Sequence, residues 1–316
     1  MTRRDWLSLA ALAGAGCHKE GGTVIGVAPK GTSSIFWQSV QAGSLAAAKK
    51  YGVEILWNGP PQETEYARQI QIVDSMINRQ VAGIVLSPTD GAALVAPVER
   101  AMAQGIPVTI FDSGIDTENY VSFVATDNRA AGGLAAKTMS GLLPSGGEVA
   151  LVRHAPGSLS TSRREEGFHA AVESTYPDLK IVNEQFCMSD RARALAVAED
   201  MLTAHPALSG LFCSSEAATV GAAQALRARG LAGKVKLVGF DASPELQEGL
   251  RDGVIDALVV QDPFFMGFRG VETIIEKLRG ETPQKRIDSP ARAVTKADLD
   301  SPEVQKLLAP DLEQYL

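Results

Sequence analysis

The chain has 316 residues, of which 45% are hydrophobic, and this is enough to build two ordinary α/β domains with separate cores. Its 30 Lys and Arg against 37 Asp and Glu leave a formal charge of -7. With this balance, and without a basic cluster interleaved with aromatics, we expect no nucleic-acid partner.

The first residues are typical of an export signal, with Arg3 and Arg4 followed by an apolar run that is too short to span a bilayer. Residues 2–7 resemble the twin-arginine export motif, with Trp where Phe is usual, and residues 13–17 resemble a lipobox, with Gly14 where Leu is usual. We expect residues 1–22 to be an export signal and linker, and Cys17 to be lipidated as a membrane anchor in the periplasm. A plain secretory peptide with an incidental cysteine is the alternative.

From Thr23 onward, short apolar runs alternate with amphipathic stretches, a pattern that predicts a parallel sheet covered by helices on both faces. The strands are expected at 24–28, 53–57, 83–86 and 108–111, and the helices at 34–51, 63–79 and 92–104.

The same alternation restarts after Asp127, so we expect a structural duplication: two Rossmann-like lobes of α/β class joined by a three-segment hinge. Helices are expected at 129–143, 162–176, 190–205 and 216–229, and strands at 148–152, 180–186, 209–213 and 236–240. The first lobe would comprise 23–126 with 263–290, and the second 127–262 with 291–316.

Three polar side chains end apolar, strand-like runs. Asp112 follows residues 106–111, Asp241 follows Phe240, and Gln261 follows Val260. Because ligands of open parallel sheets bind at the carboxyl ends of the strands, we expect these groups to converge on one cleft. The two aspartates could instead cap following helices, and Asp127 is expected to be a cap or a hinge residue.

From Thr23 to about Val294 the chain resembles periplasmic sugar-binding proteins of the ribose/galactose type, the substrate-binding subunits of ABC importers. The motifs that carry the resemblance occur in the family's order: Ile35-Phe36-Trp37, Leu86-Ser87-Pro88-Thr89-Asp90, Phe111-Asp112, Ala125-Thr126-Asp127-Asn128, Arg164-Glu165-Glu166-Gly167-Phe168, Leu202-Thr203-Ala204-His205-Pro206, Val238-Gly239-Phe240-Asp241 and Gln261-Asp262-Pro263.

The resemblance implies a ligand pocket made of five residues. Asp112, Asp241 and Gln261 would bind sugar hydroxyls, and charge-assisted bonds to the two carboxylates would be the stronger ones. Phe36 and Trp37 would stack on the C–H faces of the sugar. The two aromatics could equally be core residues of the first helix.

The chain departs from the family at three cleft positions, where small hydroxyls replace larger donors: Ser113 and Ser162 in place of Arg, and Ser215 in place of Asn. Lys30 stands where relatives have a small polar residue, and it would either restore one positive charge or pair with a cleft acid. A wider, less cationic pocket argues against plain ribose and for a larger or differently substituted polyol.

Catalytic machinery is not visible in the sequence. There is no Gly-x-Ser-x-Gly, no Cys/His pair with zinc spacing and no Gly-Lys-Ser/Thr phosphate loop, so we expect neither an enzyme nor a cofactor or metal site. Cys187 and Cys213 are expected to end strands on opposite sides of a central strand and to remain free, buried thiols.

These observations predict an exported, monomeric solute-binding protein that closes over a sugar or related polyol and delivers it to the membrane subunits of an ABC importer. A sensory protein that presents its ligand to a membrane receptor is the alternative. The effector domain of a lac-repressor-type regulator shares the fold, but residues 1–22 cannot hold a helix-turn-helix. The sequence does not name the sugar.

Overall fold

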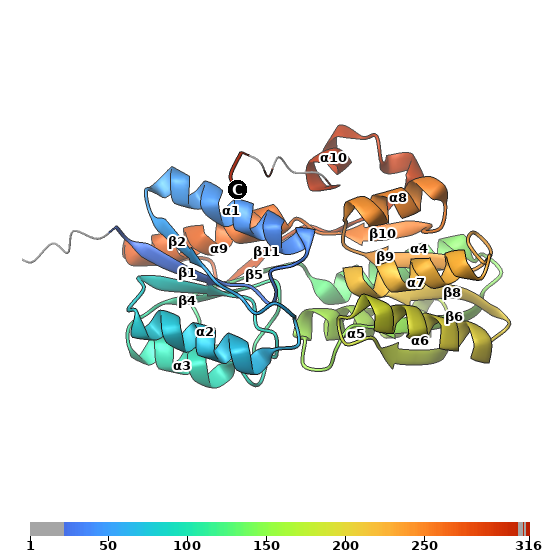
Figure 1. The fold of residues 1–316 in the computed structure, drawn as a ribbon, viewed down its shortest axis with the longest axis horizontal. Coiled ribbons are helices and arrows are strands. Elements are labelled where there is room, and N and C mark those ends of the chain that lie inside the picture. Colours follow the sequence, from blue (N-terminus) through green and yellow to red (C-terminus); the bar gives the residue numbers. More distant parts are fainter. Residues whose placement is uncertain (1–21, 309–311, 313) are drawn as a thin grey trace, which may run out of the picture.

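The structure, a computed structural model, describes residues 22–308, 312 and 314–316, so Cys17 and the expected export signal lie outside the described residues. Two lobes lie side by side, each built on one six-stranded sheet (Figure 1). The first lobe contains β1 (Val24–Ala28), α1 (Ile35–Tyr51), β2 (Glu54–Trp57), α2 (Tyr66–Asn78), β3 (Gly83–Leu86), α3 (Val95–Ala103), β4 (Val108–Phe111), β5 (Phe123–Ala125), α9 (Pro263–Leu278) and β11 (Arg286–Asp288).

The second lobe is built from the middle of the chain and its last described part. It contains α4 (Asn128–Leu142), β6 (Gly147–Arg153), α5 (Leu159–Thr175), β7 (Leu179–Phe186), α6 (Arg191–Ala204), β8 (Leu208–Cys213), α7 (Glu216–Ala228), β9 (Lys236–Phe240), α8 (Pro244–Asp252), β10 (Ala257–Val260), β12 (Arg292–Thr295), a 3-10 turn (Lys296–Asp298) and α10 (Pro302–Leu308).

The two sheets have matching strand orders, β11-β5-β4-β3-β1-β2 and β12-β10-β9-β8-β6-β7. All strand pairs are parallel except β10 with β12 at the edge of the second sheet. The expected α/β class and the duplication are therefore confirmed. The antiparallel edge strand is the one departure from the expected all-parallel sheets.

Each sheet is buried on both faces, which explains why its strands are continuous apolar runs. In the first lobe, α1 and α9 cover one face and α2 and α3 the other. In the second, α4 and α5 pack on one face while α6, α7 and α8 cover the opposite one.

Two helix pairs approach unusually closely, and both carry residues of the site described below. A Cβ added at Gly43 of α1 would lie 2.0 Å from the carbonyl oxygen of Phe264 in α9, and one at Gly132 of α4 would lie 1.9 Å from that of Arg164 in α5. Only glycine permits such an approach. These contacts pack α1 against α9 and α4 against α5.

The chain passes between the sheets three times: from β5 to α4, from β10 to α9 and from β11 to β12. Parallel strand ends of both sheets face the junction between the lobes (Figure 1). The residue-level division into lobes, and the hinge motion about these passages, remain predictions.

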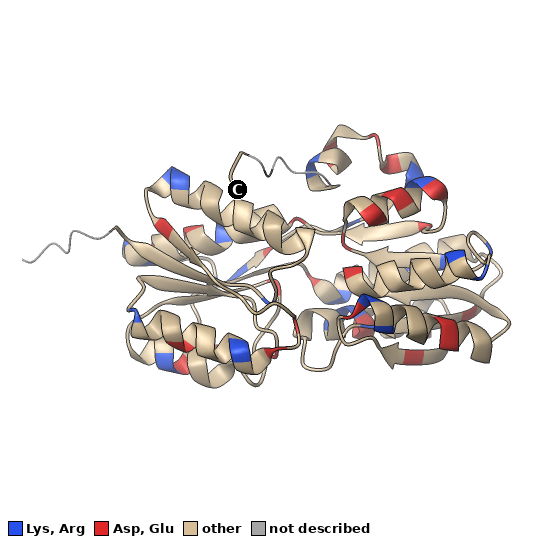
Figure 2. Ribbon diagram, in the orientation of Figure 1, with Lys and Arg blue, Asp and Glu red and all other residues tan. Residues whose placement is uncertain are grey.

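Basic and acidic residues are interspersed over both lobes (Figure 2). Within the described ranges, no helix is both long and apolar enough to cross a membrane. Cys187 directly follows β7 and Cys213 ends β8, and these two strands lie on either side of β6. Both thiols are free and buried, as expected.

Candidate functional site

A cavity of about 430 Å³ lies between the two lobes. Most of the residues that line it follow the carboxyl ends of strands or begin helices, where parallel α/β sheets place their ligands. The lining residues used below are Lys30, Phe36, Trp37, Glu63, Asp112, His154, Ser160, Arg164, Arg191, Ser215, Glu216, Asp241 and Gln261.

Asp112 and Asp241 occupy corresponding positions in the two lobes. Each follows a Phe at the end of a strand, has a left-handed backbone (φ 56° and 71°) and donates its backbone N–H to a carbonyl of the neighbouring strand, Val124 or Val259, at 2.9 Å. Neither caps a helix: the N-cap of α8, which follows Asp241, is Ser243, and the element that follows Asp112 is strand β5. This rare conformation, which Asp tolerates better than most residues, turns both carboxylates into the cleft.

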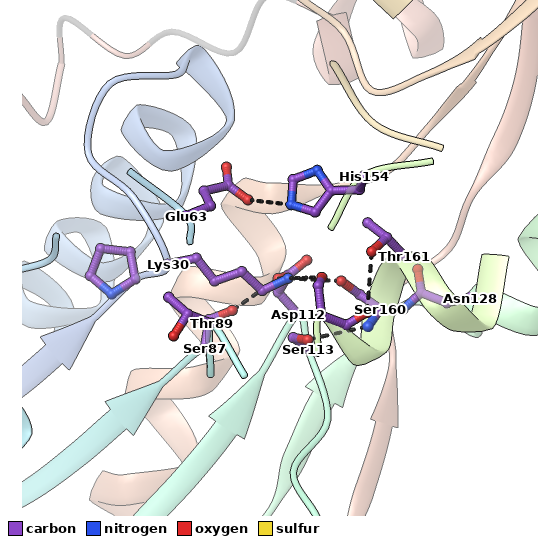
Figure 3. A network of polar contacts seen from close by, with 12 residues as sticks. Lys30, Glu63, Ser87, Thr89, Asp112, Ser113, Asn128, His154, Ser160 and Thr161 are labelled. Carbon is purple, nitrogen blue, oxygen red and sulfur yellow. Dashed lines mark hydrogen bonds and ion pairs between the residues drawn. The ribbon is translucent and has the colours of Figure 1, made fainter. Parts of the chain in front are cut away.

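Asp112 already has two partners within its own lobe. Its Oδ2 lies 3.2 Å from the ammonium of Lys30 and accepts a hydrogen bond from Ser87 at 2.9 Å (Figure 3). The carboxylate and the ammonium are both almost completely buried. A buried ion pair of this kind holds each partner in place, because either charge alone would be costly in this environment.

Asp241 is paired more loosely. Gln261 donates to its Oδ1 at 2.6 Å, and an Nη of Arg164 lies 4.0 Å from its Oδ2. Burial raises the pKa of Asp241, although Arg164 and Gln261 favour its charged form. The side chain lines the cavity, so its Oδ2 can accept a hydrogen bond from a ligand.

Arg164 is held rigidly on α5. Its guanidinium lies over the ring of Phe240 at 3.8 Å and donates to Asn128 Oδ1 at 2.8 Å and to the carbonyl of Ser214 at 2.9 Å. Planar stacking with several fixed hydrogen bonds is a geometry that suits Arg and not Lys.

Phe36 and Trp37, at the start of α1, form the apolar wall of the cavity. Their rings meet edge to face, with centroids 4.9 Å apart and planes at 84°, and Trp37 also packs against Phe111. Trp37 is only 2% exposed and belongs to the core of the first lobe. The cleft and the core interpretations of these aromatics therefore both apply.

Glu63 and His154 face each other across the cavity from different lobes (Figure 3). Glu63 Oε1 accepts from Trp37 Nε1 at 2.8 Å, and its Oε2 lies 3.5 Å from His154 Nε2. Burial raises the pKa of Glu63, and burial, together with the charges of Lys30 and Arg164, lowers the pKa of His154 to about 3. The imidazole is therefore neutral at physiological pH.

A fourth acidic group, Glu216, also lines the cavity. Glu216 begins α7 and pairs with Arg191 of α6 at 2.6 Å. Burial and the nearby Asp241 raise the pKa of Glu216 to about 7, against the opposing effect of Arg191. Its charge thus changes near neutral pH.

Several buried polar atoms on the cavity wall have no hydrogen-bond partner among the described residues: Gln261 Oε1, Ser215 Oγ and both ring nitrogens of His154. Because buried polar groups in native proteins are nearly always paired, such a concentration on one cavity points to a polar ligand.

The chain matches the family described as "Periplasmic binding protein domain" over residues 25–282. The chain belongs to this family. It is 28% identical over 271 residues to a ribose import binding protein from Bacillus subtilis, covering 86% of this chain and 87% of the relative. It is 31% identical over 255 residues to the D-allose-binding periplasmic protein of Escherichia coli, covering 78% and 82%.

Solved structures of solute binding proteins match most of this chain. A carbohydrate transporter solute binding protein from Agrobacterium radiobacter, in complex with D-arabinose, matches with a TM-score of 0.88 and 34% identity over 92% of this chain and 99% of that one. An ABC transporter solute binding protein from Agrobacterium vitis, with bound D-fucose, matches with a TM-score of 0.87 and 37% identity. The match covers 90% of this chain and 99% of that one.

Two residues expected in this periplasmic binding protein's pocket, Ser113 and Ser162, lie outside the cavity lining, and their contact with a ligand stays a prediction. Ser113 is completely buried, with its hydroxyl turned to the backbone N–H of Ser160. Ser162, half-buried on α5, does not line the cavity, whereas Arg164, one helical half-turn later, does. The cleft is therefore less depleted of cations than the substitutions suggested, since Lys30, Arg164 and Arg191 all line it.

The neutral His154 predicts a dependence of stability on pH. An unfolded chain exposes this imidazole with an ordinary pKa of about 6.5, so between about pH 6.5 and 3 the unfolded state binds one proton more than the folded state. The free energy of unfolding is therefore not reduced by His154 above about pH 6.5. Below that pH it falls on acidification, by up to about 1.4 kcal/mol per pH unit. Urea unfolding from pH 7 to pH 4 should show a shallower loss in His154→Gln than in the wild type. Equal slopes would contradict the buried, neutral state of His154.

Proposed function

We propose that this protein is the solute-binding subunit of an ABC sugar importer and binds a sugar, or a related polyhydroxylated small molecule, in the cavity between its lobes. The observation that carries the proposal is the convergence of two strand-end carboxylates, one from each lobe, on one cavity. The wall of this cavity holds buried polar atoms that have no hydrogen-bond partner within the described part of the chain. Relatives whose names include sugars, such as those for ribose, D-allose, D-arabinose and D-fucose, support the same ligand class.

The residues divide the recognition of a sugar between them. Asp241 and Gln261, in the second lobe, accept hydrogen bonds from sugar hydroxyls. Asp112, in the first lobe, accepts one with its Oδ1, since Lys30 and Ser87 both contact its Oδ2. Trp37 and Phe36 cover apolar C–H surface, and Arg164 donates to ring or hydroxyl oxygens. Because residues of both lobes contact one ligand, binding favours the closed arrangement.

A thermal-shift screen tests this function. Ribose, allose, arabinose, fucose, galactose, sugar acids and polyols are added singly, and a ligand of the native state should raise the melting temperature by mass action. We expect at least one neutral sugar to give a clear, saturable shift. No shift with any member of the panel would overturn the proposed ligand class.

A sensory role, in which the closed form is presented to a membrane receptor, uses the same fold and pocket. If the membrane partner is an importer, adding the liganded protein to proteoliposomes that contain this partner should stimulate sugar uptake. If the partner is a receptor, no sugar uptake should occur. We favour import because the curated relatives include ribose import binding proteins. We propose that the protein acts as a monomer. The proposal includes no enzymatic activity and no cofactor.

The export signal leads to a separate proposal, that the mature chain begins at Cys17, carries lipid there and faces the periplasm after export by the twin-arginine route. Expressed in its host, the wild type should partition with membranes, and Cys17→Ala should release it in soluble form. Mass spectrometry of the wild type should find acyl chains on the N-terminal residue. An unmodified N-terminus downstream of Cys17 would overturn the lipid anchor.

A further inference from the structure

Lys30 makes contacts that no sugar-binding role requires. The residue is 2% exposed, and its ammonium has three protein partners: Asp112 Oδ2 at 3.2 Å, Ser158 Oγ at 3.1 Å and Ser160 Oγ at 2.8 Å. An ammonium has three protons, so these partners can use all of them. Lys30 therefore has no donor left for a ligand, although it lies on the cavity wall.

Two of these partners lie in the other lobe. Lys30 follows β1 of the first lobe, whereas Ser158 and Ser160 lie at the start of α5 in the second. Figure 3 shows Lys30 and Ser160. Ser158 is the N-cap residue of α5, yet its hydroxyl makes no capping bond and accepts from Lys30 instead. A serine at this position ordinarily caps its own helix.

A fourth residue completes the same connection. The hydroxyl of Ser113, from the first lobe, accepts from the backbone N–H of Ser160 at 3.2 Å. This N–H is one of the first-turn donors that a helix leaves unpaired, so α5 receives its cap from across the cleft. Ser113 is completely buried in this arrangement.

We propose that Lys30, Ser113, Ser158 and Ser160 form an inter-lobe latch that stabilises the closed arrangement independently of any ligand. Lys30 is then a positioning residue: it fixes Asp112 in the cleft and ties the lobes together. Because all contacts of the latch are made between protein atoms, it raises the closed fraction of the ligand-free protein. A larger closed fraction raises apparent affinity in proportion, without any added contact to the ligand.

Small-angle scattering of the ligand-free protein tests the latch. The variant Ser158→Ala/Ser160→Ala removes both inter-lobe acceptors of Lys30 and leaves its pair with Asp112 intact. We expect its radius of gyration to exceed that of the wild type, with an unchanged far-UV circular dichroism spectrum. Ser174→Ala, at an exposed position in the last turn of the same helix, is the matched control and should scatter like the wild type.

Lys30→Met, which keeps most of the side-chain stem, should open the ligand-free protein at least as far. If it fails to fold, the double serine variant still decides. Equal radii of gyration for the ligand-free wild type and the double variant would overturn the latch.

The latch and the proposed sugar site can fail separately, because the scattering comparison needs no ligand. With a sugar that the thermal-shift screen identifies, the saturated wild type and double variant should reach the same compact radius. The variant should bind that sugar about tenfold more weakly, because its closed fraction is lower. Unchanged affinity would contradict the latch and leave the sugar site standing.

Discussion

Asp241→Asn should abolish most of the sugar affinity while the protein stays folded. Asparagine keeps the shape of the side chain and tolerates the left-handed backbone that residue 241 adopts, so the substitution removes the charge and little else. Loss of a buried, charged partner in a closed site costs about 2 to 5 kcal/mol, which corresponds to an affinity loss of about 30-fold to a few thousandfold. Isothermal titration calorimetry with the sugar from the screen measures it.

A matched control lies at the other end of the same sheet. Asp256 precedes β10 and pairs with Lys236 at 2.9 Å, away from the cavity lining. Asp256→Asn removes the same charge from the same lobe, so it should bind the sugar as the wild type does. Near wild-type affinity in Asp241→Asn, or an equal loss in Asp256→Asn, would mean that the effect is not local to the cleft.

Trp37→Ala should weaken both folding and binding. The ring is buried in the core of the first lobe and also lines the cavity. Truncation of a core aromatic costs about 3 to 5 kcal/mol of stability, and aromatic anchors in closed pockets contribute about 2 kcal/mol or more to binding. Urea unfolding measures the first loss, and calorimetry at a temperature where the variant is folded measures the second.

Trp37→Phe separates the two roles of the ring. It keeps an aromatic wall but removes the N–H that Glu63 Oε1 accepts at 2.8 Å. We expect most of the stability to be retained, with a smaller loss of affinity than in Trp37→Ala. If Trp37→Ala destabilised the fold and left the affinity unchanged, Trp37 would be a core residue alone.

The fold was largely predictable because its signals are local. Unbroken apolar runs gave β1, β3, β4 and β9 their observed bounds, and the amphipathic stretches placed the helices between them within a few residues. The short strands β5, β11 and β12 were not predicted. Arg286–Asp288 and Arg292–Thr295 have no apolar run of their own, and they become strands by pairing with distant parts of the chain, β5 and β10.

The resemblance to the family indicated Lys30, Phe36, Trp37 and Ser215, which line the cavity, whereas the residues alone indicated the site only where a strand ends on a polar side chain. Asp112, Asp241 and Gln261 were found in this way and converge on the cavity. His154 follows β6 just as Asp241 follows β9, so the same signal could have found it. Glu63 lies in a loop between β2 and α2, where nothing in the sequence indicates which loop residue faces the cleft.

The role of Lys30 shows a different limit of sequence reasoning. Its pairing with a cleft acid was one of two expected outcomes, and Asp112 is that acid. Its bonds to Ser158 and Ser160 depend on how the two lobes meet, 128 and 130 residues apart along the chain. Such contacts follow from tertiary structure and leave no local pattern.

The most direct test of the account is a crystal structure of the protein with the sugar that the screen identifies. The account predicts the sugar between the lobes, with hydroxyls within hydrogen-bonding distance of Asp241, Gln261 and Asp112 and with one face against Trp37. A sugar bound outside this cavity, or bound in it without contact to either aspartate, would contradict it.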